Sequence, residues 1–187
     1  NRKTFGAERY SNWFVQSSWH NLPTVNGCDQ PFGEQYASTE FIANKNLRRI
    51  STEIAGAYPD QAKVQSYKVT YSLSRCGDLN VVHEFAIDSL VKRNVLHFLV
   101  ANKPAMLSEG RVDLGNGMVM IYDPEVLTAE IETKSLVGLG FSSRWGDALY
   151  RINLTATRLE NKGKYTINIK YEGEETIAQI AERVVKV

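Results

Sequence analysis

An alternation of apolar and polar side chains over residues 147–171 constrains the fold more than any other feature of this sequence. Over residues 147–159 the apolar side chains would share one face of an extended chain and the polar side chains the other, which is typical of a half-buried strand. The same alternation resumes over residues 165–171. The segment Asn161-Lys162-Gly163 lies between them and offers a glycine where a left-handed turn residue is needed. The sequence therefore predicts a β-hairpin here.

The residues after Gly173 follow the period of a helix instead. Glu174 and Glu175 would occupy the first turn, where the helix dipole favours acidic side chains. The apolar residues that recur at helical spacing are Ile177, Ile180, Ala181 and Val184. We therefore expect an amphipathic C-terminal helix that covers the sheet.

A second covering helix is predicted over residues 40–57. The apolar residues that would line one of its faces are Ala43, Leu47, Ile50, Ile54 and Ala57. Pro59 would end this helix, because the residue before a proline is disfavoured in the helical conformation.

Two further β-hairpins are indicated between these helices. Residues 67–73 and 81–87 each alternate in polarity, and the turn sequence Cys76-Gly77-Asp78 lies between them. Gly115-Asn116-Gly117, between residues 111–114 and 118–122, is a strong hairpin signal.

The remaining apolar segments are assigned by composition and length. Residues 94–101 fit either a helix or a strand buried on both faces, and we favour the strand. Residues 128–141 are interpreted as a strand in which Gly138 and Gly140 mark a bulge.

Residues 1–36 are rich in aromatic and turn-forming types and follow no sustained period, so we predict an irregular arm with one short strand over residues 13–17. One interpretation is a docking arm that inserts Trp13, Phe14 and Trp19 into a partner, because aromatic anchors dominate interfaces. The other, which we favour, is that these rings close one side of the domain's own core.

Arg144 and Trp145 lie side by side in the connection 142–146, outside any core pattern. This pair suits contact with an anion or a protein. The alternative, which we again favour, is that Trp145 caps the open end of the sheet while Arg144 is solvated.

Composition narrows the classes of function. Lys and Arg total 22 against 21 Asp and Glu, a net charge of +1, which argues against nucleic-acid binding. No apolar run is long enough to span a bilayer as a helix. Asn at position 1 is interpreted as the result of signal-peptide removal or of an artificial boundary. Cys28 and Cys76 fit either one disulfide in an oxidising compartment or two reduced thiols.

The sequence carries no recognisable catalytic, cofactor or metal signature. The three histidines, His20, His83 and His97, are too scattered to be read as a ligand set. Glu130 and Glu132 would share a strand face, but exposed sheet faces often carry such pairs. We therefore predict no catalytic residues, no cofactor and no metal, and expect binding rather than catalysis.

The fold predicted from these elements is α+β, with an arm over residues 1–36 and a single domain over residues 37–187. A mainly antiparallel sheet of about six to eight strands would be covered on one face by the two helices. The alternative is a β-sandwich or jelly roll with peripheral helices.

Three classes of function fit this fold. The leading one is a non-enzymatic binding or assembly domain outside the cytoplasm, such as a bacterial envelope or secretion subunit, with a protein partner or a second copy of itself. The others are a viral coat or matrix protein, and a small-molecule carrier or enzyme with a cavity between sheet and helices.

Overall fold

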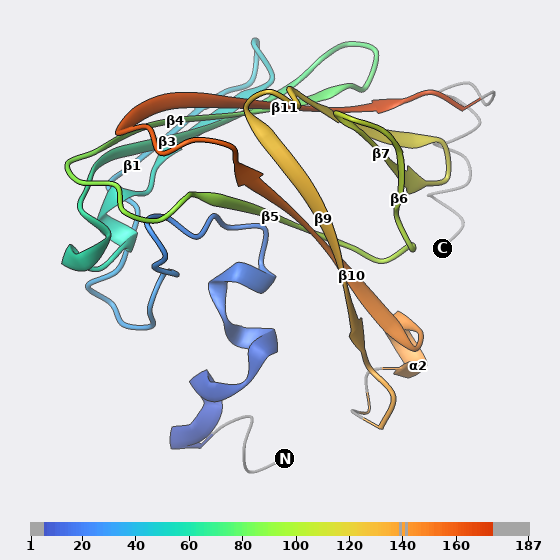
Figure 1. Ribbon diagram of the computed structural model, residues 1–187, viewed down its shortest axis with the longest axis horizontal. Helices are drawn as coiled ribbons and strands as arrows, with labels where there is room; N and C mark the ends of the chain where they lie inside the picture. The colour runs from blue at the N-terminus through green and yellow to red at the C-terminus, as the bar shows by residue number, and fades with distance from the viewer. Residues whose placement is uncertain (1–5, 139, 141, 174–187) are drawn as a thin grey trace.

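The computed structural model describes residues 6–138, 140 and 142–173, and these residues form two stacked antiparallel sheets with an N-terminal arm beside the smaller one (Figure 1). The large sheet contains, in spatial order, β1 (Glu40–Asn44), β2 (Arg49–Glu53), β3 (Val64–Leu73), β4 (Leu79–Ile87), β11 (Lys162–Tyr171), β8 (Met118–Tyr122), β7 (Arg111–Gly115) and β6 (Ala105–Ser108). The small sheet contains β5 (Val95–Val100), β10 (Ala148–Ala156) and β9 (Leu127–Ser135). The arrangement resembles a β-sandwich.

The core lies between the two sheets, where the apolar side of each alternating strand is buried. The large sheet contributes Tyr67, Val69, Val81, Phe85 and Ile167, and the small sheet contributes Leu96, Leu127, Ile152 and Leu154. Side chains from the two inner faces pack together as in other sandwiches. For β3, β4, β10 and β11 the alternation therefore predicts the buried face correctly.

The predicted α+β class is wrong, because no long helix covers the sheet among the described residues. The one α-helix found there, α2 (Ser142–Trp145), has four residues. The predicted helix over residues 40–57 is instead the β1–β2 hairpin, followed by a short 3₁₀ turn, η4 (Ala55–Ala57). The helical spacing of its apolar residues was coincidental: Ile50 pairs with Ala43 on one side and Tyr71 on the other, as suits a β-branched side chain. The predicted C-terminal helix lies outside the described residues.

The predicted hairpin over residues 147–171 is also wrong, although both of its strands exist. β10 pairs with β5 and β9, whereas β11 pairs with β4 and β8, so the chain crosses from one sheet to the other between them. Gly163 lies within β11 rather than in a turn. A Cβ at Gly163 would approach the Phe85 ring to 2.7 Å, so the glycine is needed for close packing.

Several local predictions are confirmed. β3 and β4 form a hairpin, β7 and β8 form another around Asn116, and residues 95–100 form a strand. Strand β9 ends at Ser135 rather than at residue 141. Gly138 and Gly140 have left-handed backbones, with φ of 79° and 73°, in the connection to α2, which is a turn and not a bulge in a strand.

The arm contains three short 3₁₀ helices and not the strand predicted for residues 13–17. They are η1 (Ala7–Ser11), η2 (Trp13–Val15) and η3 (Ser17–Trp19). Thr24 then pairs with Val95 at the edge of β5, and Asn26-Gly27 forms a tight turn with left-handed backbones that returns the chain at Cys28. The arm thereby lies along the small sheet, on the side away from the core (Figure 1).

Of the two alternatives for Cys28 and Cys76, the disulfide is wrong, because both cysteines are free. Cys28 is half-buried beside the Asn26-Gly27 turn, whereas Cys76 is exposed in the β3–β4 turn. Among the residues that the structure describes, no helix has the length and apolar character needed to cross a membrane.

Candidate functional site

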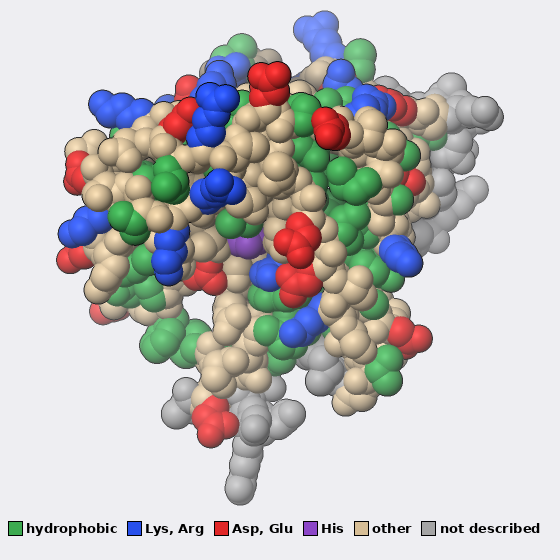
Figure 2. All heavy atoms as spheres, in the orientation of Figure 1, with side chains coloured by type: hydrophobic (Ala, Val, Ile, Leu, Met, Phe, Trp, Pro, Cys, Tyr) green, Lys and Arg blue, Asp and Glu red, His purple; other side chains and the backbone are tan. Residues whose placement is uncertain are grey.

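The outer face of the small sheet, which points away from the core, carries a concentrated set of polar side chains. Residues opposite each other in neighbouring strands share a face, so Glu132, Arg151 and Leu99 form one row, and Glu130, Asn153 and His97 form the next. Figure 2 shows a histidine in a recess on this side of the molecule, with acidic and basic side chains beside it.

Arg151 joins this face to the arm. Its Nη2 lies 2.6 Å and its Nε 3.1 Å from Glu132 Oε2, and its Nη1 donates to the Ser18 carbonyl at 3.0 Å. The guanidinium carbon also lies 4.0 Å from the centroid of the Trp19 ring. Partial burial acts to raise the pKa of Glu132, but the hydrogen bond and charge of Arg151 outweigh it and lower that pKa below its ordinary value. The ion pair is therefore charged at neutral pH and fixes the position of η3.

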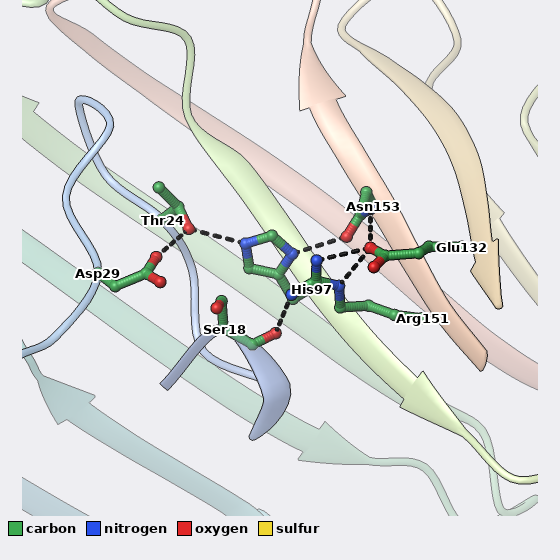
Figure 3. Close-up of polar contacts among 7 residues, drawn as sticks. All are labelled: Ser18, Thr24, Asp29, His97, Glu132, Arg151 and Asn153. Carbon is green, nitrogen blue, oxygen red and sulfur yellow. Dashed lines mark hydrogen bonds and ion pairs between the residues drawn. The ribbon is translucent and has the colours of Figure 1, made fainter. Parts of the chain in front are cut away.

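His97 lies at the centre of a second set of contacts (Figure 3). Its Nδ1 is 2.7 Å from Asn153 Oδ1 and its Nε2 is 2.8 Å from Thr24 Oγ1. The Thr24 hydroxyl also donates to Asp29, and Asn153 Nδ2 donates to Glu132 Oε2 at 3.4 Å. The series of contacts therefore runs from Asp29 in the arm to Glu132 on β9.

The hydrogen-bond donors and acceptors in this series of contacts can be assigned. Asn153 turns its amide nitrogen toward Glu132, so its oxygen faces His97 Nδ1, which must carry a proton. Burial lowers the pKa of His97 most strongly and the Arg151 charge adds to this, against the Asn153 bond and the charges of Asp29 and Glu132, so the ring is neutral at pH 7. Its Nε2 then accepts a hydrogen bond. The single Thr24 hydroxyl proton is consequently shared between His97 and Asp29.

The arm and the sheet together form a groove, which we call the arm groove. It has a volume of about 300 Å³ and is lined by Trp13, Phe14, Trp19, His20, Leu99, Leu136, Trp145 and Leu149. The Trp13 and Trp19 rings meet edge to face, with centroids 4.7 Å apart. Lys134 Nζ lies 5.2 Å from the Trp13 centroid and 5.5 Å from that of Trp19, within the range of a cation–π contact.

Four of the five predicted partner-binding residues therefore line one groove. Trp13, Phe14 and Trp19 enter it from the arm, and Trp145 enters it from α2; Arg144 is not among the lining residues. Trp19 is only 5% exposed, whereas Trp145 is 57% exposed at the opposite side of the groove. Their spatial convergence could not be foreseen, because more than a hundred residues separate the arm from α2.

His20 is a groove residue that the sequence analysis set aside. Its Nε2 lies 2.9 Å from the Phe14 carbonyl oxygen, to which it donates. In the neutral ring Nδ1 is then the nitrogen that keeps a lone pair. Within the described ranges, no group of three or more His, Cys, Asp or Glu side chains could hold a metal ion.

No protein-family model matches the chain, and no curated protein is similar to it in sequence. The solved structures that share its fold include the heparan sulfate lyase HepC from Pedobacter heparinus, at 11% identity, and a mutant of that lyase, at 12% identity, each with a TM-score of 0.58. Each match covers 88% of this chain and 26% of the lyase chain. The chain thus spans about a quarter of the length of these lyases, and the likeness concerns the fold alone.

Proposed function

We propose that this chain is a polysaccharide-binding domain that acts outside the cytoplasm and holds an acidic sugar chain in the arm groove. The observation that carries the proposal is the placement of two cations, Lys134 and Arg151, on the rings of Trp13 and Trp19 beside an apolar groove.

The groove has the two kinds of surface that an acidic sugar needs. A sugar ring has a face of C–H bonds, which packs on the flat apolar surface of an indole. Its carboxylate or sulfate groups would meet Lys134, which is half-buried at the groove, in a charge-assisted hydrogen bond. A volume of about 300 Å³ suits a short stretch of a linear chain better than the broad face of a folded partner.

The fold comparison supports the same class of ligand. The structurally similar lyases are named for heparan sulfate, which is an acidic polysaccharide. Their overall identity of 11–12% carries no residue-level argument, so the proposal rests on the groove itself.

Calorimetric titration with heparan sulfate oligosaccharides tests this function. We expect binding that weakens as salt is added, and no binding to neutral dextran. Lys134→Gln should weaken binding about tenfold, the equivalent of roughly 1.4 kcal/mol. Lys164→Gln, a control on β11 away from the groove, should leave binding unchanged. Absence of binding, or an equal loss in both variants, would contradict the proposal.

A second candidate is that the chain forms part of the active site of a lyase. The observation that favours it is His20, whose ring lines the groove with Nδ1 available as a base. Lyases of uronic-acid polymers remove a proton next to a carboxylate, which a histidine can accept. Release of unsaturated uronic acids, followed by ultraviolet absorbance and abolished in His20→Ala, would favour this function over binding alone.

A further inference from the structure

The sheets of the described chain have four edges, and three of them are protected against pairing with another strand. β5 is bonded along its edge by Thr24, which exchanges two hydrogen bonds with Val95, and by Asn21, whose side chain accepts from Leu99 N at 2.6 Å. β9 carries charged side chains at alternate positions, and β6 is only four residues long, has a register shift and follows Pro104. Such devices discourage edge-to-edge association.

β1 is the edge without these devices. Its register with β2 runs without a shift from Glu40 to Asn44, and β2 is its one strand neighbour among the described residues. All five of its residues are exposed, including Phe41 at 67% and Ile42 at 48%. The exposed apolar side chains Leu47, Ile50 and Leu73 lie beside it on the hairpin and on β3.

The direction of the β1 backbone groups follows from the neighbouring strands. Ile54 N donates to Tyr67 O and Leu73 N donates to Arg48 O, so the even-numbered residues of β2 bond to β3. Because bonding alternates along an antiparallel strand, its odd-numbered residues bond to β1. Their partners in β1 are residues 40, 42 and 44. The N–H and C=O groups of Phe41 and Ala43 therefore point to the free edge.

We propose that β1 pairs with β1 of a second copy of this chain, antiparallel and centred on Ile42, which joins the two large sheets into one. This register places Phe41 opposite Ala43 of the second copy in a hydrogen-bonded pair, on both sides of the two-fold axis. Ile42 lies opposite its own copy, in the closer pair that makes no hydrogen bonds.

Side chains in this register are complementary. The large ring of Phe41 meets the small Ala43 on the core-side face, since Phe41 pairs with Thr52 and through it with the buried Val69. The two Ile42 side chains meet on the opposite face. Glu40 lies opposite Asn44, so no like charges are paired, and a net charge of +1 produces little repulsion between copies.

Disulfide trapping tests the register. In a chain with Cys28 and Cys76 replaced by serine, Ile42→Cys should give a covalent dimer on mild oxidation, because the two Cβ atoms would lie about 5 Å apart. Glu40→Cys and Asn44→Cys are the matched controls and should stay uncrosslinked, since each would lie about 13 Å from its own copy. Crosslinking at position 40 or 44 instead of 42 would overturn the register.

Sedimentation equilibrium tests whether the chain dimerises and whether the edge of β1 is the surface that it uses. The unmodified chain should dimerise, and Ile42→Lys, which places two like charges on the axis, should raise the dimer dissociation constant at least tenfold. Ala43→Pro should do the same, because it removes an N–H that β2 does not use, while Ala43→Ser keeps that N–H and should still dimerise. Val91→Lys, at another exposed apolar residue, is the control. A chain that stays monomeric, or a dimer that is unaffected by both Ile42→Lys and Ala43→Pro, would overturn the proposal.

Discussion

The two faces of β10 differ sharply, although their residues alternate along one strand. Ile152 and Leu154 are fully buried between the sheets, as part of the hydrophobic core. Arg151 and Asn153 point the other way and bond to the arm, to β9 and to β5. The inner face contributes stability through burial, which needs no particular partner. The outer face positions the arm through directional bonds, which require particular partners.

The two buried histidines show the same contrast. His83 points into the core beside Tyr67, and its Nδ1 has no hydrogen-bond partner among the described residues. Burial lowers its pKa to about 3. His97 is nearly as buried but has a partner on each nitrogen. A histidine in the core is thus held by packing, and one under the arm by its hydrogen bonds.

The largest effect on stability is expected for substitutions in β10, where neighbouring residues on its two faces should differ. Ile152→Ala removes buried methyl groups and leaves a cavity, and it should lower the free energy of unfolding by about 2–5 kcal/mol. Asn153→Ala removes one hydrogen-bond partner of His97 and should cost about 1–2 kcal/mol. Urea unfolding of both variants measures the difference. Equal losses would mean that the two faces do not differ as described.

The pH dependence of the free energy of unfolding should show the contribution of the buried His83. Its folded pKa of about 3 lies below the ordinary value near 6.5, so the unfolded chain binds the additional proton between these values. This contribution to stability is present above pH 6.5 and is lost as the pH falls, by about 3 kcal/mol at pH 4. In His83→Leu that part of the loss should be absent. An unchanged pH profile in denaturant unfolding would contradict this account.

Two ion pairs among the described residues offer a smaller, matched comparison. Arg151 is 14% exposed and holds the arm, whereas Arg111, 2.6 Å from Glu172, is 37% exposed. Arg151→Ala should cost about 1–3 kcal/mol and release η3, which tryptophan fluorescence and limited proteolysis of the arm would detect. Arg111→Ala should cost at most about 1 kcal/mol. If the arm stays protected in Arg151→Ala, that residue does not hold it.

The smallest effect is expected at Thr24, on the arm side of the His97 contacts. Thr24→Val keeps the shape but removes the hydroxyl that lies between His97 and Asp29, and should cost about 1 kcal/mol. It should also lower the pKa of His97 further, because the protonated ring would lose its acceptor at Nε2. NMR titration of the imidazole signals measures this shift. A rise in that pKa would show that the hydroxyl acts mainly as a donor.

Local patterns in the sequence determined the strands that alternate in polarity, the buried faces of those strands and two of the hairpins. Polarity alternating with period 2 assigns β3, β4, β10 and β11, because burial on one face requires it. Glycine-containing turns assign the β3–β4 and β7–β8 connections, because few residues tolerate left-handed backbones. The sequence identified Trp13, Phe14 and Trp19 in one segment and Trp145 in another as candidate binding residues. It did not predict that they line the same groove.

Only the tertiary structure decided which strands pair and which polar side chains meet. Alternation of polarity shows which face of a strand is buried. It does not show which strand lies alongside, because the backbone groups of any strand bond equally well. β10 and β11, which are consecutive in the sequence, accordingly lie in different sheets. The bonds of His97 to Thr24 and Asn153 join residues 73 and 56 positions apart, and no local period records such distances. The elements follow from short-range sterics and burial, whereas the arm groove depends on long-range packing.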